Sequence, residues 1–290
     1  NTKIFFVLGI FGAGLMLGDG MLTPAISVIS AVEGLHVVVP SLSDWVMPLT
    51  LVILVVLFSF QSFGTEKIGL IFGPIIFIWF LTIATLGLLQ IIDNPIVLHA
   101  CNPAYAVYFF LENGWKGYAL MGGIFLVITG AEALYADLGH FGKNPIRRSW
   151  FFVALPALLL NYFGQGACLL NNPEAIVNPF YLSAPPGFAI WLMVIATLAT
   201  IIASQAVITA TFSLTKQAVL LGLYPHLPII QTSGIRGQIY IPQMNMVLAI
   251  GTVFLIFVFK NSNALTHAYG IAVNLDMVLT TTLVFYLAIK

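Results

Sequence analysis

Long, unbroken runs of apolar residues constrain this chain more than any other feature of its sequence. The hydrocarbon core of a bilayer is about 30 Å thick, and a helix needs roughly 20 apolar residues to cross it. Backbone groups cannot stay unpaired in lipid, so only helices and closed barrels span it. Barrel strands would alternate apolar and polar residues in short segments, whereas the runs here are continuous. The sequence therefore predicts an all-α polytopic membrane protein.

Hydropathy predicts eight transmembrane helices in a single domain that covers residues 1–290. The predicted spans are residues 4–30, 46–60, 68–92, 118–137, 150–170, 188–213, 241–259 and 265–289. The aromatic stretch Ala104–Leu111 is too short to span and is expected to lie in the membrane interface. The chain starts at Asn1 with no initiator methionine and ends just after an apolar run, so we expect it to be a segment of a longer protein.

The few charges carry information about class and orientation. Only 7% of the residues are charged and 60% are hydrophobic, which excludes an ordinary soluble domain. A net charge of +0 leaves no basic surface that would indicate nucleic-acid binding. Short cytoplasmic loops collect Lys and Arg, so the side that holds more of them is predicted to be cytoplasmic. That side is the side of Asn1, with Lys3, Lys67, Lys143, Arg147, Arg148, Lys216, Arg236 and Lys290, against Lys116 and Lys260 on the other.

Asp19 is the first of three acids predicted to lie inside the membrane, where a charge costs at least about 2.5–3.5 kcal/mol on insertion scales. It is flanked by Gly18 and Gly20, and Pro24 follows one turn later, so the backbone there can loosen and offer a free carbonyl. Asp19, Thr23 and Ser27 are spaced i, i+4 and i+8, which predicts one polar stripe on a helix.

Glu132 is the second acid, and it lies two residues after Gly130. Thr129, Glu132 and Tyr135 are spaced i, i+3 and i+6, which predicts another face that carries oxygen atoms. A glycine near mid-membrane with side-chain oxygens around it is typical of ion sites in secondary transporters.

The third acid, Asp276, lies near the middle of the last predicted span, and Gln205, Thr209 and Ser213 form a further stripe in the sixth. Each of these polar residues has a structural alternative. Ser and Thr in membrane helices commonly bond back to their own helix or join neighbouring helices, and a buried acid can stay neutral through hydrogen bonds. Lys143, Arg147 and Arg148 are interpreted as a topology signal that contacts lipid headgroups.

Two segments carry a resemblance to a known family: Gly18–Gly34, GDGMLTPAISVISAVEG, and Gly130–Gly142, GAEALYADLGHFG. They strongly resemble the KUP/HAK/KT potassium uptake permeases. Shorter segments are similar to the same family in the same order: NYFGQGA at 161–167, IASQAVI at 202–208, GQIYIP at 237–242 and AYGIAV at 268–273. The resemblance covers essentially the whole chain.

The resemblance implies a fold like that of the amino acid/polyamine/cation transporters, a LeuT-like core of ten helices in two inverted repeats. This chain would then hold the third to tenth helices. It implies a potassium site to which Asp19 and Thr23 contribute from the third helix, and Thr129, Glu132 and Tyr135 from the sixth. Ser27, Gln205 and Asp276 are weaker candidates. It also implies no cofactor, and it allows a homodimer formed through a C-terminal region outside this chain.

The function expected from this resemblance is uptake of potassium across the plasma membrane by symport with protons. The first alternative is an amino acid or polyamine transporter of the same fold, because an amine could also use Asp19 and Glu132. A channel is the second. The third, an intramembrane enzyme, is disfavoured because the five histidines are scattered near predicted helix ends and loops.

Overall fold

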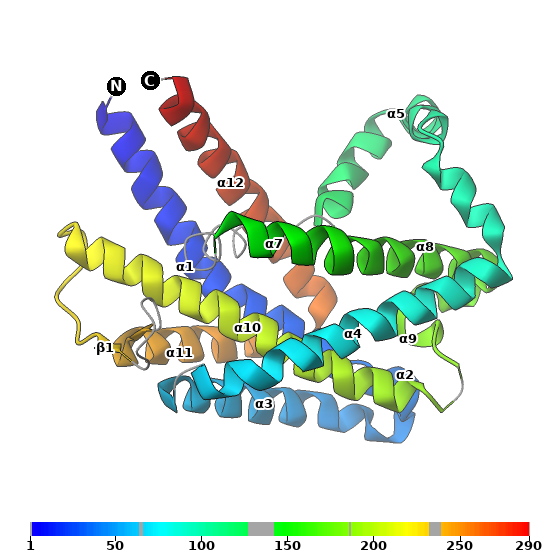
Figure 1. The fold of residues 1–290 in the computed structure, drawn as a ribbon, viewed down its shortest axis with the longest axis horizontal. Helices are drawn as coiled ribbons and strands as arrows, with labels where there is room; N and C mark the ends of the chain where they lie inside the picture. Colours follow the sequence, from blue (N-terminus) through cyan, green and yellow to red (C-terminus); the bar gives the residue numbers. More distant parts are fainter. Residues whose placement is uncertain (1, 64–65, 127–141, 186, 232–238, 290) are drawn as a thin grey trace.

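The computed structural model describes residues 2–63, 66–126, 142–185, 187–231 and 239–289, and it is built almost entirely of helices (Figure 1). Within these residues, seven helical segments are long and apolar enough to cross a membrane. They are Val7–Val38, Pro40–Phe60, Ile71–Asp93, Lys143–Asn171, Ala189–Leu220, Pro242–Phe259 and Ser262–Tyr286. The fourth predicted span, residues 118–137, lies mostly outside the described residues and stays a prediction.

The long helices match the predicted spans closely. They are α1 Thr2–Val32, α3 Val46–Phe60, α4 Glu66–Asp93, α8 Leu155–Asn171, α10 Ala189–Leu220, α11 Pro242–Phe259 and α12 Ser262–Ile289. Two helical segments extend beyond the spans predicted from hydropathy. α10 continues seven residues beyond the predicted end at Ser213, and the fifth span begins at α7, Lys143–Ser149, which a π-helical turn at Trp150–Ala154 joins to α8.

The remaining elements are short or interrupted. They are α2 Leu35–Val38, α9 Pro179–Leu182, 3-10 helices at Pro40–Trp45, Gln61–Phe63, Pro95–Cys101 and Pro173–Val177, and the antiparallel pair β1 Ile230–Gln231 and β2 Ile239–Tyr240. α5, Ala104–Phe125, consists of two helices that meet at Gly114, where φ is +49°. Glycine adopts this backbone conformation with little strain, so Gly114 sets the change of direction.

Helix α1 lies at the centre of the main hydrophobic core. Its buried residues Val28 and Ile29 pack in one cluster mainly with residues of three other helices, and Leu265 of α12 also belongs to this cluster. The partners in the three helices are Leu54, Leu57 and Phe58 of α3, Ile208 and Phe212 of α10, and Met244, Leu248 and Ile256 of α11. In Figure 1, α1 and α11 run from left to right, and α3 and α10 run in the opposite direction.

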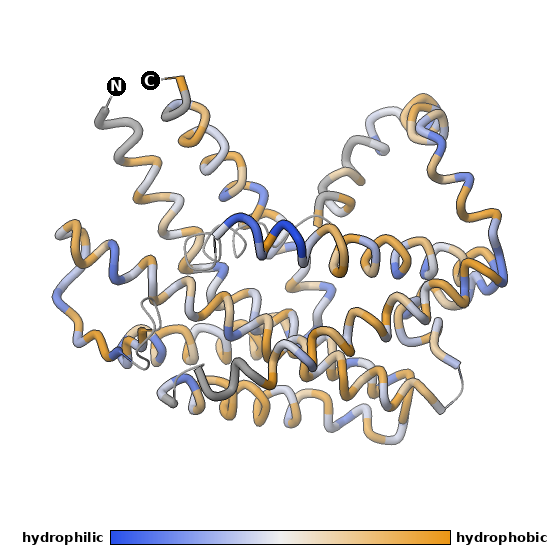
Figure 2. Tube along the Cα trace, viewed as in Figure 1, coloured by the Kyte–Doolittle hydropathy of each residue, from blue (hydrophilic) through white to orange (hydrophobic). Residues whose placement is uncertain are grey.

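Large apolar side chains also cover much of the outer surface. Figure 2 shows hydrophobic residues, in orange, along every long helix. Phe152, for example, is 81% exposed. A soluble protein rarely leaves so much apolar surface in contact with water, so these faces fit a lipid environment.

Three contacts join the end of α1 to neighbouring segments. The Tyr181 hydroxyl, in α9, donates to the Ala31 carbonyl at 2.8 Å. The backbone N–H of Ser262, at the start of α12, donates to Glu33 Oε1 at 2.9 Å, and the Ser262 hydroxyl donates to Oε2. Burial and then the charge of Glu33 raise the pKa of the Tyr181 phenol, which keeps it protonated as a donor.

Helices α4 and α8 approach each other through two glycines. A Cβ added to Gly164 would lie 2.3 Å from the Cα of Gly87, and a Cβ added to Gly87 would lie 2.1 Å from the Leu160 carbonyl oxygen. Real Cβ atoms do not come so close to backbone atoms. Small residues that let two backbones touch are typical of helix pairs in membranes.

We expect Gly164→Ala to destabilise the protein by about 1–3 kcal/mol, because the added methyl group overlaps the α4 backbone. The measurement is the apparent unfolding temperature of the purified full-length protein in detergent. Gly73→Ala in α4 is the matched control, since no atom lies within 4 Å of a Cβ at that position. If both variants unfold at the wild-type temperature, the close contact between α4 and α8 is wrong.

Candidate functional site

The candidate site is built around Asp19, in the middle of α1. Its side chain is only 5% exposed, although nearly every residue of this helix is apolar. α1 stays helical from Thr2 to Val32, through Gly18, Gly20 and Pro24. The sequence had suggested that the backbone loosens here, and that expectation is wrong for the described structure. The side chains, more than unwound carbonyls, therefore supply the oxygen atoms of this helix.

Asp19 and Thr23 form the pair that their i, i+4 spacing predicts. The Thr23 hydroxyl donates a hydrogen bond to Asp19 Oδ1, with 2.7 Å between the oxygens. A hydroxyl that donates its only proton still has lone pairs for another partner. Thr23 can thus hold the carboxylate in place and offer an oxygen to a cation. Ser27, one turn further along, is partly buried, and its backbone carbonyl accepts a bond from Ser30.

Close packing with α10 and α11 encloses this part of α1. A Cβ on Gly20 would lie 2.5 Å from Thr211 Oγ1 of α10, and one on Gly251 of α11 would lie 2.3 Å from the Met21 sulfur. The Thr252 hydroxyl of α11 donates to the Met21 carbonyl at 3.2 Å. The absence of side chains at Gly20 and Gly251 is what lets the three helices come together beside Asp19.

Two adjacent polar side chains on α10 are buried without a hydrogen-bond partner among the described residues. Gln205 is 7% exposed and Ser204 is 0% exposed, and neither Gln205 Oε1 nor Ser204 Oγ is bonded there. Gln205 was a predicted candidate, whereas Ser204 was missed because a single serine in an apolar run has no pattern of its own. The Thr209 hydroxyl bonds the Gln205 carbonyl at 2.8 Å, which is the structural alternative for a membrane threonine.

Asp276 on α12 also faces α1, but at a different level from Asp19. Its Oδ1 lies 3.8 Å from the position that a Cβ on Gly12 would take. Gly12 precedes Asp19 by two helical turns, about 10 Å along the axis. The structure therefore brings Asp276 to the same helix without bringing it to the Asp19 and Thr23 pair.

The second half of the predicted site, Thr129, Glu132 and Tyr135, lies outside the described residues. Leu126, the last described residue before it, lies beside Gly270 of α12, where a Cβ would come within 3.3 Å of a Leu126 methyl carbon. Across the described part of the chain, no group of three or more His, Cys, Asp or Glu residues could hold a metal ion. The donors that the structure does gather are hydroxyls and a carboxylate, which suit hard cations such as alkali metal ions.

The comparison with known families decides the class of protein. Residues 1–290 match the family described as "K+ potassium transporter integral membrane domain". The chain belongs to this family. The KUP resemblance in Gly18–Gly34 and Gly130–Gly142 is therefore confirmed, and the chain is an all-α membrane domain of that family.

Two curated relatives illustrate the likeness. The chain is 63% identical over 288 residues to "Probable potassium transport system protein Kup 1" of Legionella pneumophila strain Corby, covering 99% of this chain and 46% of the relative. It is 56% identical over 278 residues to "Probable potassium transport system protein Kup 2" of Legionella pneumophila strain Philadelphia 1, covering 96% of this chain and 44% of that relative. The chain thus spans about half the length of these relatives. No solved structure matches it.

We expect Thr252→Val to destabilise the potassium transporter domain by about 0.5–1.5 kcal/mol, because it keeps the shape of the side chain and removes the bond to Met21. The measurement is the unfolding temperature of the full-length protein. Thr85→Val is the control, since the exposed Thr85 hydroxyl bonds only Leu81 of its own helix, at 2.7 Å. Equal effects in the two variants would contradict a stabilising bond between α11 and α1.

Proposed function

We propose that the full-length protein containing this chain imports potassium ions across the plasma membrane together with protons. Membership of the potassium transporter family and the printed names of the Kup relatives support this function. The uneven distribution of Lys and Arg supports an orientation with Asn1 in the cytoplasm.

The observation that carries the proposal is the buried pair of Asp19 and Thr23. Acidic residues inside membrane helices are rare and commonly mark ion or proton pathways. Carboxylate, hydroxyl and carbonyl oxygens can replace the hydration shell of potassium when the ion leaves water. Asp19 then neutralises the ion, and Thr23 orients the carboxylate and adds an oxygen ligand.

Coupling to protons needs a group that gains and loses a proton during the cycle. Asp19 and Glu132 are the candidates, one for the ion and the other for the proton. The proton affinity of a buried carboxyl depends on its burial and on charges close to it, so an arriving cation changes it. Ion binding and proton binding are linked in this way. Thr129 and Tyr135 flank Glu132 at helical spacing and are proposed as its oxygen-bearing neighbours.

The proposed architecture is a LeuT-like inverted repeat in which one helix bundle moves against a scaffold. The hydrophobic core that joins α1, α3, α10 and α11 into one packed unit supports a scaffold formed by these four helices. Asp19 and Thr23 lie on this unit. Gln205 and Ser204 also lie on it, and their unbonded oxygens make α10 a further candidate lining of the ion path.

An amino acid or polyamine transporter of the same fold is the alternative, because an amine can also pair with a buried carboxylate. The two functions differ in competition. If the protein transports potassium, excess amino acids or polyamines leave potassium uptake unchanged. If it transports amino acids or polyamines, the excess compounds compete with the labelled substrate and lower its uptake.

We expect Asp19→Asn to lower rubidium uptake at low external potassium by about tenfold or more, which corresponds to about 1.4 kcal/mol or more of lost interaction with the ion. The assay uses cells that lack their own potassium importers and express the full-length protein at equal membrane abundance. Thr23→Val is expected to raise the KM several-fold, and Thr23→Ser to retain most of the activity because the hydroxyl is kept.

Asp93→Asn is the matched control for Asp19→Asn, since Asp93 is an exposed acid at the end of α4. It is expected to leave uptake unchanged. If the wild-type protein reaches the membrane and does not restore uptake, potassium transport is wrong and the alternative is favoured. If the wild type works and Asp19→Asn works equally well, potassium transport stands and Asp19 is not part of the site.

We expect Glu132→Gln to reduce uptake at low external potassium and to flatten its dependence on external pH, because Gln cannot bind and release a proton. The measurement is rubidium uptake between pH 5.5 and 8 at fixed membrane potential. A variant that keeps both the wild-type rate and the wild-type pH profile would remove Glu132 from the mechanism.

A further inference from the structure

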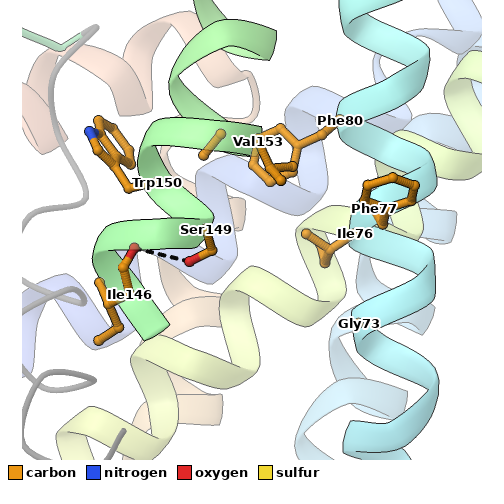
Figure 3. A pocket seen from close by; sticks show the side chains of 9 residues that line it. Gly73, Ile76, Phe77, Phe80, Ile146, Ser149, Trp150 and Val153 are labelled. Atoms are coloured by element: carbon orange, nitrogen blue, oxygen red, sulfur yellow. Dashed lines mark hydrogen bonds between the residues drawn. The ribbon is translucent and has the colours of Figure 1, made fainter. Parts of the chain in front are cut away.

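A hollow of about 360 Å³ lies between α4 and the segment that joins α7 to α8 (Figure 3). Its walls are mainly Gly73, Phe77 and Phe80 of α4, facing Ile146, Trp150 and Val153. Ser149 also lines it, but its hydroxyl donates to the carbonyls of Pro145 and Ile146. Figure 3 shows the indole nitrogen of Trp150 on the side away from α4. The inner surface of the hollow is therefore apolar.

The hollow opens close to one end of both helices. Gly73 lies seven residues after Glu66, the first residue of α4, which is about 10 Å along the axis. Ile146 lies three residues after Lys143, the first residue of α7. These are the ends that the Lys and Arg distribution assigns to the cytoplasm, so the hollow lies at the depth of the inner leaflet.

Basic residues lie on the same helical segment as one wall of this apolar space. Lys143, Arg147 and Trp150 are spaced i, i+4 and i+7, so the two cations share a helical face with Trp150 of the lining. Arg147 is exposed, and its guanidinium carbon lies 5.9 Å from the centre of the Phe151 ring. The sequence has no Asp or Glu between Asp137 and Glu174. Figure 2 shows α7 as a strongly hydrophilic segment that runs into hydrophobic α8.

We propose that this hollow binds one anionic phospholipid of the inner leaflet, with an acyl chain between α4 and α8 and the phosphate at Lys143 and Arg147. The charge complementarity selects an anion, and the apolar walls select one that carries a hydrocarbon chain. A free phosphate ion gains nothing from Phe77 and Phe80, and a zwitterionic lipid leaves part of the positive charge uncompensated. The site is independent of the proposed ion path, because none of its residues is shared with the Asp19 region.

Trp150 provides a direct probe of occupancy. The full-length protein is purified in detergent, delipidated and titrated with phosphatidylglycerol or phosphatidylcholine that carries brominated acyl chains, which quench nearby tryptophans. Other tryptophans of the chain, such as Trp115, are also exposed and contribute quenching of their own. We therefore expect a saturable component of the quenching that Trp150→Phe removes. Phosphatidylglycerol is expected to bind about tenfold more tightly than phosphatidylcholine, because each basic group near the headgroup favours the anionic lipid.

Two kinds of variant test separately how the acyl chain and the headgroup contribute to lipid binding. Lys143→Gln combined with Arg147→Gln is expected to abolish the preference for phosphatidylglycerol, whereas Lys116→Gln combined with Lys260→Gln, two exposed lysines at the other end, is expected to keep it. Gly73→Leu, which fills the hollow, is expected to weaken both lipids. Gly14→Leu is its control, since Gly14 is an exposed helical glycine that also has open space around a Cβ.

Four results would overturn the proposal. They are quenching that Trp150→Phe does not change, equal affinity for the two lipids, a preference that survives the loss of Lys143 and Arg147, and displacement of the lipid by millimolar inorganic phosphate. The charge variants replace exposed side chains, so they test the site even where Gly73→Leu does not fold. Size-exclusion chromatography checks that each variant is folded.

Discussion

A carboxylate inside a membrane helix has to be shielded from lipid, and in this chain the packing around α1 provides that shield. Gly20 and Gly251 have no side chains, so α10 and α11 come into direct contact with the turns that surround Asp19. Thr23 completes the local arrangement by donating to the carboxylate from the next turn of the same helix. The acid is thus fixed in a rigid helix, and its surroundings depend on contacts among three helices that are distant in the sequence.

Two groups of helices pack tightly among the described residues, and α4 also packs against α10. α1, α3, α10 and α11 share a hydrophobic core, whereas α4 and α8 touch through Gly87 and Gly164. The segment before α10 links them, because the Ser183 carbonyl accepts a bond from Gln90 of α4 at 2.9 Å and Tyr181 bonds Ala31 of α1. These links lie at the predicted outer end.

Hydropathy and helical spacing predicted most of the architecture because lipid imposes a strong and simple pattern on a chain. The limits of α3 agree with prediction, but α10 extends past Ser213 and the fifth span starts at Lys143, since polar residues can continue a helix beyond the hydrocarbon. The Asp19 and Thr23 pair followed from local spacing. Ser204, the position of Asp276 beside Gly12, and the contact of Gly87 with Gly164 depend on which helices become neighbours, and local periodicity does not contain that information.

The packing of α4 against α8 explains both their close contact at the glycines and the hollow at their other end. The two helices run in the same direction (Figure 1), and Gly73 and Trp150 precede Gly87 and Gly164 by roughly four turns on their respective helices. At the glycine end no side chain separates the backbones. At the other end Phe77, Phe80 and Trp150 are too large to interdigitate as closely, so the helices diverge and leave the space between them. Two helices that touch at their glycines and are held apart by aromatic rings cannot pack closely along their whole length. A lipid chain in the hollow would fill the gap that this arrangement leaves.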